Sequence, residues 1–363
     1  MRDNLPILAI LIHVVLADFD QCTSINGVGT NSPTFSSPNF PGNYPPNVDC
    51  VRVIQALPAH DILVKFHYMF HIESTYDKLE AGDECPNDFI EFRDGRYGFS
   101  PLIRRYCGNQ MPKEEIRAVS GFLWLRFRSD SMLEYQGFSA EYTNVASIGG
   151  KVNTHECLME YLNGLDGFIR SKDLISSLPK NASGTLDCTW KLLVDPKYHI
   201  AFYIKDFQLK NPNQCSENFL EIYSRDTSSK PLKRFCGLTA SDVFSPANVM
   251  YVRIYLSNVK NLNATSITAL FSSYARLKNC THEGMFACGD ENCVPKVLAC
   301  NGRPNCPYGR DEHICSVAQD TVKNFIWSGF APLCFLVFCV FVAVSLICFY
   351  TIRKNRCALP PLI

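Results

Sequence analysis

The sequence predicts an all-β protein made of two sandwich domains, a small disulfide-rich module and one transmembrane helix. Three observations predict this class. Cysteines repeat at regular spacings, apolar side chains alternate with polar ones in short runs, and one long stretch near the C-terminus has no charged side chain. The chain has 363 residues, enough for two or three domains of roughly 150 residues each.

The N-terminus has the pattern of a secretory signal peptide. Arg2 precedes an apolar run from Leu5 to Leu16, and Ala17 offers a small side chain at the cleavage position. This run is shorter than the roughly 20 residues that a spanning helix needs. We therefore expect residues 1–17 to be removed, and the cysteines that follow to lie in an oxidising compartment.

A second apolar stretch predicts a membrane-spanning helix. Residues 325–350 contain no charged side chain and are rich in Phe, Val, Leu and Ile. Basic residues cluster directly after this stretch, whereas Lys323 alone precedes it closely, and this bias places the C-terminus in the cytoplasm. We expect a single-pass type I protein of the cell membrane with residues 351–363 as a short cytoplasmic tail.

The eighteen cysteines divide by position. Three lie in the apolar stretch and Cys357 lies just beyond it, which leaves fourteen for the extracellular region. These form two quartets, Cys22, Cys50, Cys85, Cys107 and Cys157, Cys188, Cys215, Cys236, followed by the six residues Cys280, Cys288, Cys293, Cys300, Cys306 and Cys315. The second quartet follows the first at an offset of roughly 130 residues, so the chain contains an internal repeat. Four cysteines allow three pairings in each copy, and the count alone leaves the connectivity open.

Within each copy the apolar pattern is that of β-strands. Alternate residues from Val64 to Phe70, Tyr68 included, form one apolar face in the first copy. Val249 and Tyr251 continue the same period of two in the second copy. Turn-forming residues separate these runs, and short strands with such connections favour a two-sheet antiparallel sandwich over a helical fold.

Short motifs around the first quartet indicate a known family. The chain carries Ser-Pro-Asn-Phe-Pro at residues 37–41, Cys-Gly at 107–108 and Ser-Asp at 129–130. On these motifs, residues 22–142 resemble a CUB domain, and residues 157–274 resemble a divergent CUB domain that lacks the first motif. The resemblance implies two jelly-roll sandwiches with the disulfides Cys22–Cys50, Cys85–Cys107, Cys157–Cys188 and Cys215–Cys236.

The last six cysteines lie in a segment too small to fold without crosslinks. Residues 280–315 also contain Phe286 and the run Gly-Arg-Asp-Glu at 309–312. This pattern resembles a low-density lipoprotein receptor class A module, which implies the disulfides Cys280–Cys293, Cys288–Cys306 and Cys300–Cys315. A zinc knuckle is disfavoured, because secretory thiols oxidise and no Cys-x-x-Cys pair with matching His spacing is present.

The resemblance implies a calcium site in the first CUB domain. Calcium-binding CUB domains use a Glu, an Asp after the third Cys and the Asp of the Ser-Asp pair, which here are Glu73, Asp88 and Asp130. Calcium takes six to eight oxygen ligands, so backbone carbonyls and water would complete the set. The alternative is three solvated loop carboxylates. In the second copy Lys210 and Asn218 replace Glu73 and Asp88, and we expect no calcium there.

The class A family also binds calcium, through acidic side chains at four positions. Here these are Asn301, Asn305, Asp311 and Glu312, so two carboxylates have become amides. Amide oxygens carry no formal charge, and we expect a weakened calcium site whose occupancy stays open. In relatives of both modules the calcium-held carboxylates also grip a partner's Lys or Arg, and a purely structural metal is the alternative.

Four residues are candidates for covalent modification. Asn181, Asn263 and Asn279 each begin an N-x-[ST] glycosylation motif. Cys357 lies close to the membrane beside a basic residue, where it is either palmitoylated or a bare cytosolic thiol.

The sequence also argues against several function classes. Lys plus Arg and Asp plus Glu both total 35, which removes the electrostatic reason to expect a nucleic-acid partner. We find no nucleophile elbow, no zinc-protease helix and no Gly-rich phosphate loop. We therefore expect a binding protein with no enzymatic activity and no small-molecule substrate.

Two CUB domains, a class A module and one span without a protease domain are the order found in the neuropilin and tolloid-like family. The resemblance implies an auxiliary subunit that modulates gating or clustering of a ligand-gated ion channel, most directly an ionotropic glutamate receptor at the postsynaptic membrane. Worm relatives with these modules serve glutamate-receptor gating or acetylcholine-receptor clustering. The predicted tail is too short for the long cytoplasmic region of the vertebrate members, so intracellular scaffolding is left in doubt.

Two other functions fit the same modules. An adhesion molecule or protease-regulating co-receptor would need only the extracellular region. An endocytic cargo receptor would also need a sorting signal, and residues 351–363 contain no N-P-x-Y motif and no acidic residue before the final Leu-Ile pair.

Overall fold

The computed structural model describes most of the chain. The described residues are 21–27, 32–74, 85–149, 154–179, 181–276, 280, 284–313, 315 and 331–356. The predicted signal peptide 1–17, Asn279 and Cys357 lie outside them, as do residues 325–330 of the predicted span.

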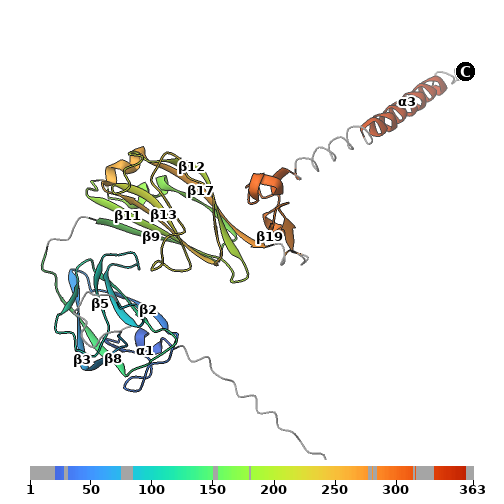
Figure 1. Cartoon of the computed structure of the whole chain (residues 1–363). Coiled ribbons are helices and arrows are strands. Elements are labelled where there is room, and N and C mark those ends of the chain that lie inside the picture. The colour runs from blue at the N-terminus through green and yellow to red at the C-terminus, as the bar shows by residue number, and fades with distance from the viewer. Residues whose placement is uncertain are drawn as a thin grey trace, which may run out of the picture. The chain divides into compact units, whose positions relative to one another are not determined.

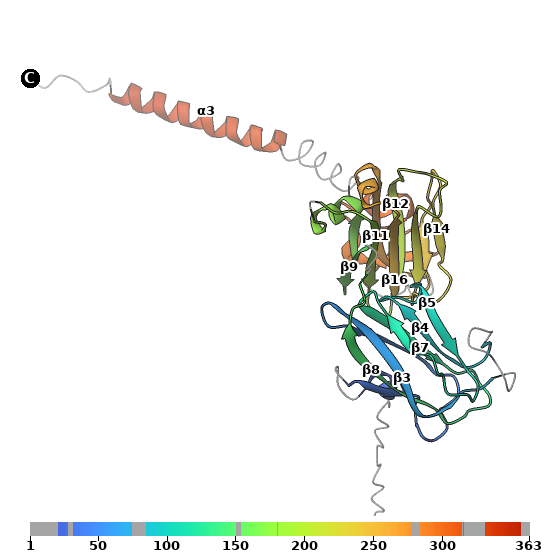
Figure 2. The ribbon, with the colours of Figure 1, turned by 90° about the vertical axis from the view of Figure 1, so that its left-hand side faces the viewer.

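The first domain is a sandwich of two antiparallel sheets (Figure 1). A short helix, α1 (Thr23–Asn26), precedes it. One sheet has the order β1-β8-β3-β6, from Thr34–Ser36, Gly137–Ala146, His60–His71 and Ile116–Ala118. The other has the order β2-β7-β4-β5, from Asp49–Gln55, Phe122–Arg128, Phe89–Asp94 and Leu102–Tyr106. Figure 2 shows β3 beside β8 in one layer and β4, β5 and β7 in the other.

The core of the first domain lies between these sheets. Phe92 of β4, Phe127 of β7 and Phe138 of β8 are completely buried, and their neighbours along each strand point the opposite way. Phe127 and Phe138 meet edge to face with ring centroids 5.5 Å apart. Packing of aromatic rings in this geometry adds to the free energy gained by burying them.

Strand β3 departs from strict alternation at Tyr68. Val64 and Phe70 are buried, but Tyr68 is 93% exposed. The register of β3 on β8 shifts between His67 and Phe70, and Tyr68 takes a φ of 63°. Three steps along β3 thus match one step along β8, so β3 bulges by two residues, Tyr68 and Met69, and Tyr68 leaves the row of paired residues. The expectation that Tyr68 shares the buried face is wrong for this reason.

The described residues of the second domain form nine strands in the same two-sheet arrangement. One sheet has the order β14-β13-β16-β11-β9, from Lys233–Phe235, Asn218–Ser224, Val249–Leu256, Thr185–Leu193 and Thr154–Leu162. The other contains β15 (Val243–Ser245), β12 (His199–Gln208) and β17 (Ser266–Arg276), with β10 (Asp166–Arg170) also paired to β17. The predicted all-β class with two sandwiches is confirmed.

Strand β16 shows the predicted alternation of apolar residues, but the face that is buried is not the one that carries Val249 and Tyr251. Met250 and Val252 are fully buried, whereas Val249 and Tyr251 are only half-buried. Sequence periodicity identifies a strand but does not choose its buried face when both faces carry apolar residues.

A buried ionic network lies on the other face of this sheet. Arg253 donates from Nε and Nη2 to the two oxygens of Asp187, at 2.8 and 2.7 Å, and from Nη1 to Glu221 Oε2 at 3.2 Å. Tyr223 donates its hydroxyl to the same Glu221 oxygen at 2.8 Å. Glu221 is only 5% exposed, so its charge depends on these partners rather than on water.

The class A module contributes a hairpin, β18 (Met285–Ala287) and β19 (Asn292–Pro295). The fourteen cysteines that precede the predicted span are all bonded, in the connectivity that the resemblances imply. The pairs are Cys22–Cys50, Cys85–Cys107, Cys157–Cys188, Cys215–Cys236, Cys280–Cys293, Cys288–Cys306 and Cys300–Cys315.

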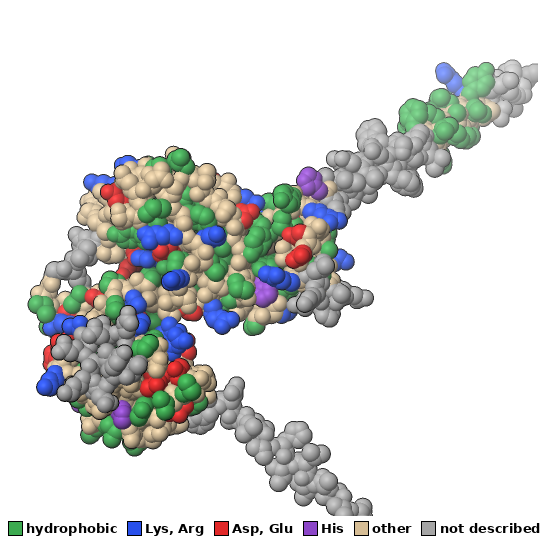
Figure 3. All heavy atoms as spheres, viewed as in Figure 1, with side chains coloured by type: hydrophobic (Ala, Val, Ile, Leu, Met, Phe, Trp, Pro, Cys, Tyr) green, Lys and Arg blue, Asp and Glu red, His purple; other side chains and the backbone are tan. Residues whose placement is uncertain are grey.

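A single long helix, α3 (Ala331–Arg356), follows the module. The stretch Phe335–Arg353 is long and apolar enough to cross a membrane, and none of it is buried against the rest of the protein. Figure 3 shows hydrophobic side chains covering the described part of this helix.

Candidate metal centre

Three carboxylates of the first domain come from three different strand ends. Glu73 follows β3, Asp88 directly precedes β4, and Asp130 follows β7. Strands β4 and β7 are antiparallel neighbours, with Phe89 opposite Arg128, so β4 begins where β7 ends. The topology therefore brings Asp88 and Asp130 together, and β3 of the facing sheet adds Glu73 at the same end of the sandwich.

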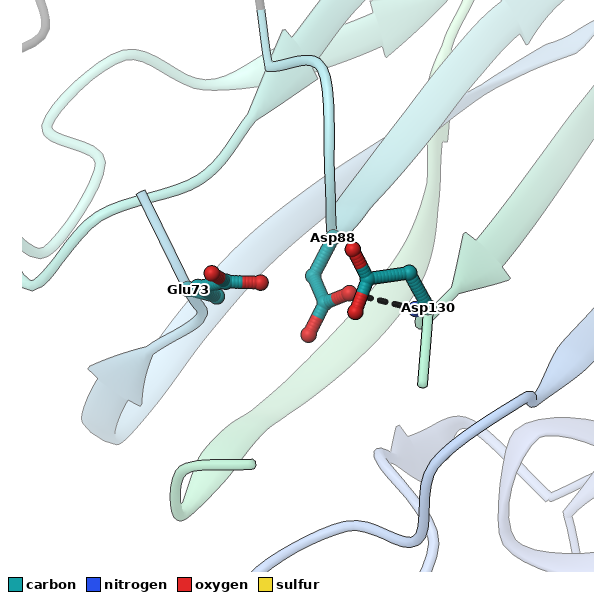
Figure 4. Close-up of side chains that lie close together, drawn as sticks. All are labelled: Glu73, Asp88 and Asp130. Atoms are coloured by element: carbon teal, nitrogen blue, oxygen red, sulfur yellow. Dashed lines mark hydrogen bonds between the residues drawn. The ribbon is translucent and has the colours of Figure 1, made fainter. Parts of the chain in front are cut away.

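The three side chains converge on one point (Figure 4). One carboxylate oxygen of each lies within 4.8 Å of the others. In the view of Figure 4, Asp88 lies between Glu73 and Asp130. A divalent cation with ligand distances of about 2.4 Å fits between oxygens at this separation.

Tyr44 holds this arrangement in place from inside the domain. Its hydroxyl donates to Asp88 Oδ2 at 2.6 Å and accepts from the Glu73 backbone N–H at 3.0 Å. The other oxygen of Asp88, Oδ1, accepts from the Asp130 backbone N–H at 2.7 Å. Tyr44 is 1% exposed, and burial followed by its hydrogen bond to Asp88 raises the pKa of the phenol, which therefore remains a donor. The Asp88 carboxylate is thus tied directly to the Asp130 backbone and, through the Tyr44 hydroxyl, to the Glu73 backbone.

Two of the three carboxylates are buried, and no described basic side chain neutralises the group. Asp88 is 1% exposed and Glu73 is 6% exposed. Burial raises the pKa of both groups, and the nearby charge of Asp130 raises it further. None of the three forms an ion pair with any described Lys, Arg or His.

One oxygen of Glu73 identifies what this cluster lacks. Oε1 accepts from Asn87 Nδ2 at 2.9 Å, but Oε2 is buried without a hydrogen-bond partner among the described residues. An unsatisfied buried carboxylate oxygen is costly, and a metal ion supplies both the missing partner and the compensating charge. Hard oxygen donors suit calcium, so the residues present fit that ion.

The corresponding end of the second domain is closed by hydrogen bonds instead. Asn218 is completely buried, and its side-chain amide donates to the carbonyls of Asn211 and Gln214 at 2.7 and 3.0 Å. Its Oδ1 accepts from the Asn211 backbone N–H at 3.2 Å. Lys210 lies at the surface. At the position of Asp88, the second domain thus has an amide whose donor and acceptor groups are both used within the loop.

In the class A module, the two carboxylates among the four expected calcium ligands accept hydrogen bonds from backbone N–H groups. Asp311 is buried, and its oxygens accept from the backbone N–H groups of Asn305 and Cys306 at 2.7 and 3.1 Å. Glu312 accepts from the backbone N–H groups of Asn301 and of the residue after it, at 2.9 and 3.1 Å. Within the described residues, the group Glu73–Asp88–Asp130 is the one place where three possible metal-ligating side chains converge.

The candidate glycosylation sites are placed at the surface where they are described. Asn181 and Asn263 are both exposed. Glycan attachment at Asn181, Asn263 and Asn279, and lipidation of Cys357, remain predictions.

Sequence reasoning did not find two residues that matter for these sites. Tyr44 lies three residues after the Ser-Pro-Asn-Phe-Pro motif, but its contact with Asp88 joins residues 44 positions apart. Asp166 begins β10 and binds the class A module, and no local pattern in the sequence marks it.

Comparisons with known proteins agree with the modules. Residues 22–142 and 154–268 match the family described as CUB domain, and residues 278–315 match the low-density lipoprotein receptor domain class A. The chain is 34% identical over 293 residues to neuropilin and tolloid-like protein 2 of Mus musculus, and it is as similar to the Homo sapiens protein. That similarity covers 79% of this chain and 53% of the mouse protein, so the chain spans about half the length of these relatives. The predicted resemblance is confirmed.

Other relatives share the CUB domains alone or in other contexts. Cubilin of Sus scrofa is 32% identical over 219 residues, which cover 60% of this chain and 5% of cubilin. A solved structure described as the MASP-1 CUB2 domain bound to Ca2+ is 30% identical, covers 30% of this chain and 88% of that chain, and has a TM-score of 0.26.

Proposed function

This chain belongs to the CUB-domain family, and from that membership we propose that it is a single-pass membrane protein that modulates a neighbouring ligand-gated ion channel. Its CUB domains and class A module are binding modules, so we expect the protein to act by binding another protein. The resemblance to the neuropilin and tolloid-like family points to an ionotropic receptor of the glutamate class.

The observation that carries this proposal is the order of the modules, which lies within one continuous alignment to neuropilin and tolloid-like proteins. Two CUB domains, a class A module and an apolar helix follow one another, and the similarity to neuropilin and tolloid-like proteins extends over 79% of the chain. A protein held by α3 meets other membrane proteins laterally. The second CUB domain and the class A module directly precede α3 in sequence, so we assign them the contacts closest to the membrane.

Modulation of gating sets a physical condition on those contacts. A bound protein shifts an open–closed equilibrium only by binding one state more tightly than the other. We therefore propose that the extracellular region contacts channel surfaces that differ between the open, closed and desensitised states. Contacts that are equal in all states would instead change surface clustering without changing the time course of the current.

We also propose that Glu73, Asp88 and Asp130 hold a calcium ion in the first CUB domain. The convergence of their oxygens and the unpaired Glu73 Oε2 support this assignment. The ion would join the ends of the two sheets, and the half-buried Asp130 would be the carboxylate of the three that a partner's Lys or Arg can reach. Calcium supplies charge and ligand bonds only, and the binding geometry comes from the chain.

Crosslinking at the surface of cells that naturally make the protein tests the proposed partner. We expect a subunit of a ligand-gated channel to co-purify after short-range crosslinking and detergent extraction. A control protein that keeps α3 but carries an unrelated extracellular region identifies partners attracted by the helix alone. Recovery of soluble cargo or matrix proteins without any channel subunit would contradict the proposal and support the receptor or adhesion alternatives.

A further inference from the structure

The second CUB domain presents a carboxylate to the face of the class A module where calcium was expected. Asp166, at the start of β10, accepts through Oδ2 from the side-chain amides of Asn301 and Asn305, at 3.2 and 3.1 Å. Its other oxygen, Oδ1, accepts from Arg303 Nη1 at 3.2 Å. The side chain of Asp166 is 12% exposed, so these donors replace most of its water.

The groups gathered around Asp166 are hydrogen-bond donors, which is the opposite of what a calcium site needs. A cation needs oxygens turned toward it, whereas Asn301 and Asn305 turn N–H groups toward a carboxylate. Asn305 is completely buried and also donates to Ser272 Oγ at 3.1 Å. Arg303 adds a positive charge at the same place. An anion of the second CUB domain thus binds the two residues that stand at the positions where calcium-binding class A relatives carry carboxylates.

The remaining oxygens of the four expected ligands are mostly engaged. Both oxygens of Asp311 and both of Glu312 accept backbone N–H groups of the module. Asn301 Oδ1 accepts from the Arg303 backbone N–H at 2.8 Å. Asn305 Oδ1 is buried without a partner among the described residues, but one neutral oxygen is far short of the six to eight that calcium takes.

Apolar packing joins the same two parts of the chain. Tyr203 of β12 and Leu270 of β17, which point away from the core of the second CUB domain, are buried in a cluster with the class A module. The module contributes Val294 and Leu298, both nearly or completely buried. Arg303 lies over the ring of Phe168 at 5.7 Å from its centroid.

Backbone hydrogen bonds also join the class A module to a sheet of the second CUB domain. Strand β19 pairs with the end of β17, with Ala275 opposite Cys293 and Arg276 opposite Asn292. The hairpin of the module therefore extends the β15-β12-β17 sheet of the second CUB domain. Both parts fall within the same compact unit of the chain.

We propose that the class A module is docked permanently on the second CUB domain through Asp166 and folds without calcium. The two then move as one body, and the face that binds calcium and ligands in relatives is used inside the protein. A partner must therefore bind another surface of this body. The module is a rigid spacer between the second CUB domain and α3 rather than an independent ligand-binding unit.

Hydrogen exchange of the full chain in lipid nanodiscs tests calcium independence first. We expect residues 284–313 to exchange at the same rate in millimolar calcium and after chelation. Faster exchange of this segment after chelation would overturn the proposal, because it would mean that the module holds an ion of its own.

Substitution of Asp166 tests the dock. Asp166→Ala removes an acceptor from the buried amide of Asn305, the exposed amide of Asn301 and the guanidinium of Arg303, and we expect residues 285–298 to exchange about tenfold faster. Arg303→Ala, a change at a more exposed side chain that leaves the disulfides and core intact, should raise exchange of the same segment by a smaller factor. Glu160→Ala is the matched control, because it removes an exposed carboxylate paired with Lys191 on the β14-β13-β16-β11-β9 sheet, which the module does not extend, and it should change nothing in residues 285–298. Unchanged exchange in both Asp166→Ala and Arg303→Ala would contradict the dock.

Restoring the acidic residues should recreate a calcium requirement. The double variant Asn301→Asp and Asn305→Asp places two carboxylates against Asp166, so in chelator the segment 285–298 should exchange faster than in the natural chain. Adding calcium should then slow it. Equal exchange of the double variant and the natural chain in chelator would mean that Asp166 does not face these positions, and the proposal would fail.

Discussion

Replacement of Arg253 by methionine is expected to lower the free energy of unfolding of the second CUB domain by about 3 kcal/mol. Methionine keeps much of the apolar length but removes the guanidinium that binds Asp187 and Glu221. Glu221 is 5% exposed, so its charge is left buried with fewer partners. Denaturant-dependent hydrogen exchange of β16 measures this free energy in the whole chain, without a contribution from the first domain.

Lys191→Met provides the control for this substitution. Lys191 pairs with Glu160 at 3.2 Å on an exposed part of the same sheet, and loss of such a pair costs less than about 1 kcal/mol. Adding Glu221→Gln to Arg253→Met should recover part of the loss, because it removes the buried charge. Equal, small effects of Arg253→Met and Lys191→Met would show that the buried network contributes no more than a surface pair.

Removal of calcium is expected to lower the melting temperature of the first CUB domain and leave the second unchanged. An ion bound only by the folded state stabilises it by about 1.4 kcal/mol at ten times its Kd, which corresponds to roughly 5 °C in a domain of this size. Asp130→Ala should abolish this response. Asn218→Ala should destabilise the second domain, since it removes buried hydrogen bonds, but should leave the calcium response of the first intact. Scanning calorimetry of the part of the chain that precedes α3 gives both results.

The calcium response should also depend on pH in a defined direction. Without the ion, the pKa values of Glu73 and Asp88 are raised by burial. Folding then favours their protonated forms, a stabilising contribution that is complete below their ordinary pKa values and is lost as pH rises through the raised ones. These two groups therefore stabilise the calcium-free domain least near neutral pH. The difference in melting temperature with and without calcium should shrink as the pH falls. The same melting temperature with and without calcium at neutral pH would contradict the metal assignment.

Much of this architecture can be read from the sequence because it depends on local or repeated features. The cysteine repeat and the CUB and class A motifs predict the modules, and the three expected carboxylates do converge. The exposed Tyr68 could not be predicted, since a bulge depends on how β3 pairs with β8. The dock of Asp166 joins residues 135 to 139 positions apart.

One sequence signal of that dock is nonetheless present. Strand β17 is buried along almost its whole length, and Leu270 and Phe271 are buried on opposite faces. A strand with apolar residues on both faces is covered on both sides. In the second CUB domain the core covers one face and the class A module covers part of the other.

Recording of agonist-evoked currents tests most directly whether this protein acts on a channel in its own membrane. Glutamate-class receptors are expressed alone, with the full chain, or with a control that keeps α3 and replaces the extracellular region. We predict that the full chain, and not the control, changes the time course of desensitisation or deactivation, or the amount of receptor labelled at the cell surface. Unchanged currents and surface levels across glutamate and acetylcholine receptors, with no channel subunit crosslinked to the chain, would contradict the proposal and favour an adhesion function.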